Sequence, residues 1–122
     1  MAKARSAFAD ARHWRTYTLS VTDVRRTPLR ELVEARRNEI KAITARHHGR
    51  SIALFGSVAR GDDHAASDLD FIVEFEPGTR PFEVLLLGAE LEAALGVPVD
   101  VGTPETLRAR LRDEVLAEAV PL

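Results

Sequence analysis

The chain has 122 residues, no cysteine and a formal net charge of -2, with 45% hydrophobic and 30% charged residues. This length and balance are typical of one globular domain and leave no room for a second independent core. The lack of cysteine excludes disulfides, thiolate catalysis and cysteine-ligated zinc. No apolar run reaches the roughly 18 residues of a membrane span, and the N-terminus lacks the apolar stretch of a secretory signal, so we expect a cytoplasmic protein without membrane contact.

Charge is distributed unevenly along the chain. Residues 1–50 carry twelve Lys and Arg against five Asp and Glu, a balance of +7, whereas residues 51–122 carry five against fourteen, a balance of -9. The basic half fits a solvated helix face with a loose tail, and nucleic acid is the less favoured partner for it. The acidic half would repel a nucleotide unless metal ions bridged the charge.

Residues 1–26 show no sustained periodicity and are predicted to be a poorly ordered or helical extension of a domain that spans 27–122. We hypothesise that Val21 marks an alternative start codon of the native protein. Thr27 and Pro28 are typical of a helix N-cap and first helical position, and one helix is predicted from there to Gly49.

The rest of the domain alternates strands and helices. Strands are predicted at 51–55, 68–75 and 97–101, a helix runs from Pro81 to Gly96, and a last helix starts at Thr103. This order predicts an α/β domain with a small sheet. The apolar stripe of the last helix is Leu107, Leu111, Val115 and Leu116.

Two aspartates, Asp68 and Asp70, begin the second predicted strand. Because side chains alternate across a strand, both carboxylates point to one face about 7 Å apart, while Leu69, Phe71 and Val73 face the core. The two carboxylates repel each other, and Mg²⁺ relieves such repulsion together with substrate phosphates. The pair therefore either holds a metal or begins the strand with solvated charges, although aspartate is disfavoured in strands.

Gly56 and Ser57 directly follow the first strand. Glycine lets the backbone approach a ligand, and the N–H groups at the start of a following helix would face phosphate. An ordinary turn with Ser57 as a helix cap is the alternative.

Asp100 is the third candidate, on the face of its strand opposite Val99 and Val101. If that strand pairs beside the second, Asp100 can reach the same metals or act as general base for an attacking hydroxyl. The alternative is a lone aspartate on an edge strand.

Gly56-Ser57, ten residues, and then Asp68-Leu69-Asp70 match the Gly-Ser-x10-Asp-x-Asp signature of the polymerase-β-like nucleotidyltransferase superfamily. Residues 55–61 (Phe-Gly-Ser-Val-Ala-Arg-Gly) resemble its minimal, MNT-type branch. The resemblance extends over roughly residues 28–121 and leaves the N-terminal extension uncovered.

This resemblance implies a small mixed β-sheet flanked by helices and a site that uses ATP with two Mg²⁺ ions. It makes Asp68, Asp70 and Asp100 the catalytic and metal-binding residues, and Gly56 and Ser57 the triphosphate contacts. Arg60 then touches phosphate or makes a salt bridge on the helix surface.

The family also implies a partner. Many minimal members are antitoxins that transfer AMP to a tyrosine of a HEPN-type toxin in HEPT/MNT systems, and form a complex with it. The chain lacks the second substrate domain of antibiotic-modifying relatives, which favours a protein acceptor. Two alternatives stay open: an antitoxin that neutralises its toxin by binding alone, and a nucleotidyltransferase that acts on a small molecule.

Other polar residues are given lesser roles. His47 and His48 are expected at a helix end, where imidazole suits the helix dipole. His64 could contact a nucleotide from the loop between the two motif halves. Asp62 and Asp63 are expected to be solvated turn residues.

Overall fold

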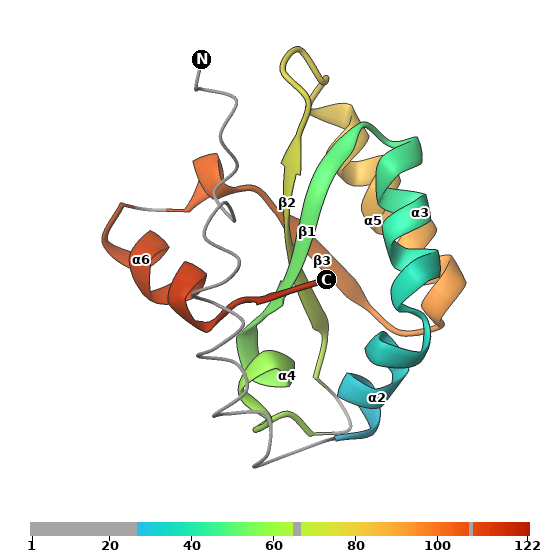
Figure 1. Cartoon of the computed structure of the whole chain (residues 1–122), viewed down its shortest axis with the longest axis vertical. Helices are drawn as coiled ribbons and strands as arrows, with labels where there is room; N and C mark the ends of the chain where they lie inside the picture. The colour runs from blue at the N-terminus through green and yellow to red at the C-terminus, as the bar shows by residue number, and fades with distance from the viewer. Residues whose placement is uncertain (1–26, 65–66, 108) are drawn as a thin grey trace.

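The computed structural model describes residues 27–64, 67–107 and 109–122, without the side chains of 109–112. The expected extension at 1–26 and the side chain of Leu111 therefore lie outside the described residues. In this part of the chain, four strands form one sheet in the order β3-β2-β1-β4 (Figure 1). They are β1 (Gly49–Phe55), β2 (Leu69–Phe75), β3 (Val99–Gly102) and β4 (Val120–Pro121).

The sheet is mixed, as the family resemblance implies. β1 pairs antiparallel with β2, and β4 pairs antiparallel with the other edge of β1. β3 lies parallel to β2, and the connection between them passes through helix α5 (Phe82–Leu95). β4 was not predicted from the sequence, because two residues are too short to show an alternating pattern.

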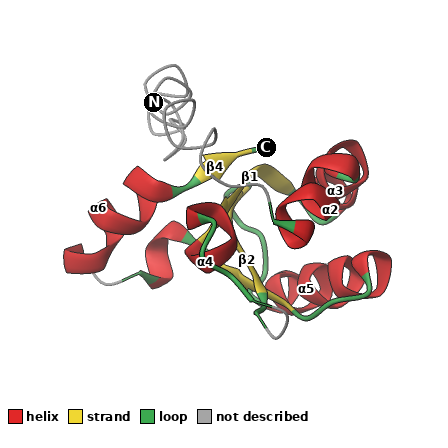
Figure 2. Cartoon of the chain, turned by 90° about the horizontal axis from the view of Figure 1, so that it is seen from below, coloured by secondary structure: helices red, strands yellow, loops and turns green. Residues whose placement is uncertain are grey.

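Helices cover both faces of the sheet. Helices α2 (Pro28–Ala35), α3 (Arg37–Arg46) and α5 lie on one side and α6 (Ala109–Glu118) lies on the other, while α4 (Gly56–Arg60) lies between them and contacts both α2 and α6 (Figure 2). The main core packs under the first group, and its largest fully buried side chains include Ile40, Leu54, Leu69, Phe71, Leu87 and Leu91. A smaller cluster under α6 is centred on Ala53, Ile72 and Ala119.

The predicted first helix is two helices. Its start is confirmed, because the Thr27 hydroxyl accepts the Arg30 backbone N–H at 3.2 Å and Pro28 is the first helical residue. The helix is interrupted at Arg36, although no glycine or proline marks the position. The Arg36 guanidinium donates to the Ala94 carbonyl of α5 at 2.9 Å, so the interruption lies at a residue with a tertiary contact that local propensity does not encode. The second helix ends at Arg46, and the left-handed backbone of His48, rather than Gly49, turns the chain into β1.

The predicted last helix also begins later than expected. Residues Pro104–Thr106 form a short 3-10 turn, η2, and α6 starts only at Ala109. The Thr106 hydroxyl closes this turn, because it donates to the Thr103 carbonyl at 2.8 Å and accepts the Thr103 N–H at 3.2 Å. The predicted apolar stripe is confirmed for Val115 and Leu116, which pack against the smaller cluster from α6, whereas Leu107 packs there from the turn before the helix.

His47 connects α3 to α5. Its two ring nitrogens lie 2.9 Å from Glu83 Oε1 and 2.7 Å from Glu90 Oε1. The hydrogen bonds to Glu90 and Glu83 raise the pKa of His47 above its ordinary value against the opposing effect of burial. The imidazole is therefore a structural link between two helices of the main core layer.

Among the described residues, no helix is both long and apolar enough to cross a membrane.

Candidate active site

The register of β2 and β3 places two of the predicted carboxylates side by side. Asp70 and Asp100 are direct partners across the parallel pair, and Asp68 immediately precedes β2. The Leu69 N–H donates to the Pro98 carbonyl at 3.0 Å, which fixes the start of the pair. Val99 and Val101 pack against the core on the other face of β3, as the alternation predicts. The prediction that the third strand lies beside the second is therefore correct.

Asp70 is the carboxylate with the most perturbed ionisation. Its side chain is partly buried, and this burial together with the charges of Asp100 and Asp68 raises its pKa to about 6, while Arg60 acts in the opposite direction. A carboxylate in this position is unfavourable without a counter-charge. The three aspartates therefore form one electrostatically coupled group at the start of β2 and on the neighbouring β3.

The turn after β1 brings the backbone against this group. Gly56 has φ = +81°, and a Cβ atom built on it would lie 2.5 Å from Asp70 Oδ2. Phe55, which precedes it, is the register partner of Asp70 across β1 and β2. Only glycine combines this left-handed backbone with such a close approach. The two halves of the sequence motif, Gly56 and Asp70, are therefore in direct contact.

Two further contacts hold the short helix that carries Ser57. Gly61, with φ = +81°, ends α4 in the left-handed conformation, and its N–H donates to the Ser57 carbonyl at 2.9 Å. Arg30 is only 3% exposed, and its guanidinium donates to the Ala59 carbonyl at 3.4 Å and to Glu34 at 3.4 Å. Arg30 was not predicted as a site residue, although its position three residues before the buried Val33 places both on one helix face. It is a positioning residue for α4.

Arg60 lies on the surface between two carboxylates. Its guanidinium pairs with Asp62 at 3.2 Å and with Glu118 at 3.4 Å. The salt bridge that the sequence offered as one alternative for Arg60 is therefore observed. The positive charge of Arg60 also lowers the pKa of Asp70. Asp62 is exposed, as expected, and pairs with Arg60, whereas the expectation for Asp63 needs correction, because its Oδ1 is buried without a hydrogen-bond partner among the described residues.

The carboxylate oxygens of the site are the kind of ligand that a hard divalent cation prefers. Mg²⁺ takes oxygen ligands, usually from one or two carboxylates together with waters and substrate phosphates. Among the described residues, no three acidic or imidazole side chains converge into a complete metal-binding group. The site therefore fits Mg²⁺ only as a cation whose shell a bound nucleotide helps to complete.

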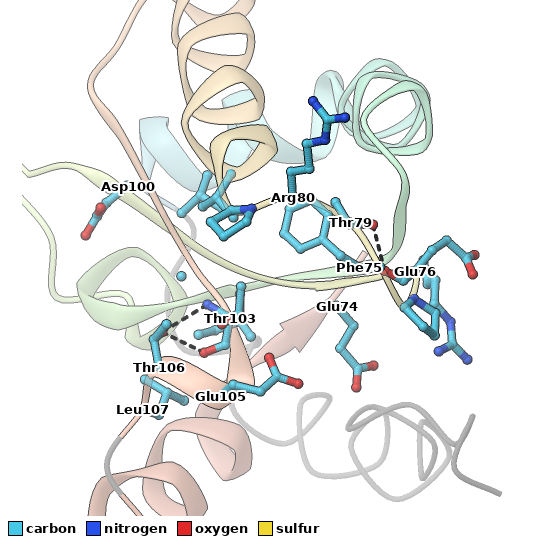
Figure 3. Close-up of a pocket in the computed structure, with 18 of the residues that line it drawn as sticks. Glu74, Phe75, Glu76, Thr79, Arg80, Asp100, Thr103, Glu105, Thr106 and Leu107 are labelled. Atoms are coloured by element: carbon cyan, nitrogen blue, oxygen red, sulfur yellow. Dashed lines mark hydrogen bonds between the residues drawn. The ribbon is translucent and has the colours of Figure 1, made fainter. Parts of the chain in front are cut away.

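A pocket of about 870 Å³ opens beside the carboxylates, on the side of β3 (Figure 3). Asp100 lines one end of it, and residues of the sheet, of the turn between β2 and α5 and of η2 line the rest. Gly56, Ser57, Asp68 and Asp70 do not belong to its described lining. The pocket is thus adjacent to the motif residues rather than formed by them, and sequence patterns gave no sign of it.

The mixed sheet and the acidic group beside a glycine turn define an α/β protein of the nucleotidyl-transferring type. Residues 36–122 match the family model described as "Nucleotidyltransferase domain". The chain therefore belongs to the nucleotidyltransferase domain family, and the predicted enzyme class is confirmed.

Two curated relatives carry related names. A Methanocaldococcus jannaschii protein named "Putative protein adenylyltransferase MJ0435" is 39% identical over 87 residues, which make up 68% of this chain and 94% of that protein. Protein adenylyltransferase MntA of Thermococcus cleftensis is 35% identical over 80 residues, or 66% of this chain and 81% of the relative.

Solved structures share the fold. One described as a "putative minimal nucleotidyltransferase" has a TM-score of 0.69 at 43% identity, covering 75% of this chain and 94% of that one. A toxin–antitoxin crystallised with AMP-PNP has a TM-score of 0.53 at 26% identity, covering 61% of each chain. The predicted mixed sheet and the resemblance to minimal nucleotidyltransferases are confirmed.

Replacing Gly56 by alanine should damage the site more than the fold. The new Cβ would displace the Asp70 carboxylate, and a shift of this size costs roughly 100-fold in the rate of nucleotidyl transfer. Gly78→Ala is the matched control, because Gly78 has a similar φ of +86° but nothing within 4 Å of its Cβ position. Both variants carry a similar backbone penalty, measured as a fall in Tm. An equal loss of transfer rate in the two variants would contradict the proposed contact.

Asp70→Asn should stabilise the fold at neutral pH while it removes activity. A pKa raised to about 6 in the folded state means that the ionised carboxylate opposes folding above that pH. The Tm gain of Asp70→Asn should therefore be present at pH 7.5, shrink as the pH falls through about 6, and vanish near the ordinary value of 3.8. Asp113→Asn, which removes an exposed carboxylate on α6, serves as control. A Tm gain that does not depend on pH would refute this electrostatic explanation.

Proposed function

We propose that this protein is a magnesium-dependent adenylyltransferase that transfers AMP from ATP to a hydroxyl of a protein, a tyrosine of a cognate HEPN-type toxin, and thereby acts as its antitoxin. The observation that carries this proposal is the contact between the Gly56 turn and Asp70, next to Asp100. That contact brings a phosphate-binding type of turn and a carboxylate pair into one site.

The proposed role of each residue follows from its position in the site. Gly56 and Ser57 stand at the start of α4, where helical N–H groups have no intrahelical partner and suit a phosphate. Asp68 and Asp70 would hold Mg²⁺, with Asp100 as third ligand or as proton acceptor. Bound Mg²⁺, as one or two ions, would neutralise charge on the phosphates during transfer.

Asp100 is suited to the proton transfer. It is exposed and lines the pocket, so an acceptor hydroxyl there could give its proton to the Asp100 carboxylate. The hydroxyl oxygen would bond to the α-phosphorus of ATP, and the bond to the pyrophosphate group would break. Arg60 could exchange its surface salt bridges for a phosphate contact.

Support for the acceptor class comes from relatives. The names of both curated relatives include protein adenylyltransferase, and one solved neighbour is a toxin–antitoxin with AMP-PNP. AMP-PNP is an ATP analogue, which favours ATP as the nucleotide.

The decisive experiment uses a HEPN-type protein encoded beside the gene for this chain. We expect its mass to rise by one or more adenylyl groups on incubation with the wild-type chain, ATP and MgCl₂. Asp68→Ala and Asp70→Ala should abolish the gain, and Asp113→Ala should leave it unchanged.

Two results would contradict the proposal. Full neutralisation of the toxin by Asp68→Ala and Asp70→Ala without a mass change would indicate an antitoxin that acts by binding alone. Transfer of AMP to a small molecule, with none to protein, would indicate the other alternative.

A further inference from the structure

Helix α5 exposes large apolar side chains to solvent. Phe82 is 62% exposed, Leu85 69% and Leu86 39%, and these are the large exposed apolar residues among the described residues. They occur within five consecutive positions of one helix. The opposite side of the same helix buries Leu87, Leu91 and Leu95 in the core. A helix that is apolar on both sides indicates that a second surface packs on its outer side.

This apolar surface adjoins the pocket beside Asp100. Pro81 and Val84 line the pocket. In the sequence, Phe82 directly follows Pro81 and Leu85 directly follows Val84, in the first turns of α5. Residues three and four positions apart share a helix face, so Leu85 and Leu86 continue from Phe82 as one ridge, which begins next to Pro81 at the rim of the pocket. We call Phe82, Leu85 and Leu86 the α5 ridge.

The pocket itself is acidic. Its lining contains the carboxylates of Glu74, Glu76, Glu105 and Asp100 against the guanidinium groups of Arg50 and Arg80. Figure 3 shows Arg80 extending away from Glu74 and Glu105. A negative lining disfavours the triphosphate, which the Gly56 turn is placed to receive, and favours a neutral or cationic group.

We propose that the α5 ridge and the acidic pocket form one docking surface for the acceptor protein, which places apolar side chains on the ridge and a basic segment bearing the acceptor hydroxyl in the pocket, beside Asp100. This assignment rests on the proposed function and specifies how the acceptor is recognised. Apolar anchors supply affinity at such an interface, and the charge of the pocket selects the segment that enters.

A second copy of this chain is a less suitable occupant. A symmetric pair built on the α5 ridge would bring the same patch of each copy together and the two pockets toward each other. The acidic pockets of two copies would also repel each other.

The test measures adenylyl transfer to the HEPN-type protein in wild type, Leu85→Asp and Glu105→Arg. Both variants should raise the KM for the acceptor by roughly tenfold or more, the scale of an interface hot spot, with AMP-PNP affinity unchanged. Ala93→Asp is the matched control, because Ala93 is exposed near the other end of α5. A cysteine-free chain also allows a single photo-crosslinker at Leu85→Cys, with Ala93→Cys as its control.

Each outcome has a separate meaning. Absence of transfer by the wild-type chain would refute the proposed function and this surface with it. Transfer by the wild type, with Leu85→Asp and Glu105→Arg equal to Ala93→Asp, would refute the docking surface alone. A dimer of the free chain in light scattering that Leu85→Asp dissociates would assign the α5 ridge to self-association instead. Crosslinking of the acceptor from position 85 and not from position 93 would support the proposal.

Discussion

The contact between the Gly56 backbone and the Asp70 carboxylate is the constraint on which the site depends. The space for it exists only because residue 56 has no Cβ and can adopt φ = +81°. The antiparallel pairing of β1 and β2 sets Phe55 opposite Asp70, so the turn must pass over the carboxylate. Arg30 and Gly61 then hold α4 in place behind the turn. The chain thus positions the Gly56 turn against the acidic group with backbone geometry rather than with mobile side chains.

This arrangement concentrates negative charge at a partly buried position. Burial of Asp70 and its neighbours Asp100 and Asp68 raise its pKa, so the carboxylate acts against folding at neutral pH. The core on the opposite face of the sheet offsets this cost, because Leu69, Phe71 and Val73 are fully buried there. Strand β2 therefore carries buried apolar side chains on one face and carboxylates on the other. A bound cation would lower the repulsion between these carboxylates.

Much of this could be predicted from the sequence because the signals are local. Alternation along 68–75 predicted the face of the aspartates, and Gly56 next to a strand end predicted a close approach. The long-range features could not be predicted. The interruption lies at Arg36, which contacts Ala94 in another helix, and β4 is a strand only through pairing with β1. The burial of the Asp63 Oδ1 atom and the pocket beside Asp100 arise from the packing of segments that are distant in sequence. Sequence periodicity therefore cannot predict them.

We propose that the Gly56 turn and the three carboxylates form one nucleotide site that a divalent cation completes. Calorimetric titration of the wild-type chain with AMP-PNP, in MgCl₂ and in EDTA, tests it most directly. We expect AMP-PNP to bind in MgCl₂ and its affinity to be roughly tenfold or more lower in EDTA, because phosphate and carboxylate then repel each other. Equal affinity in both buffers would contradict it.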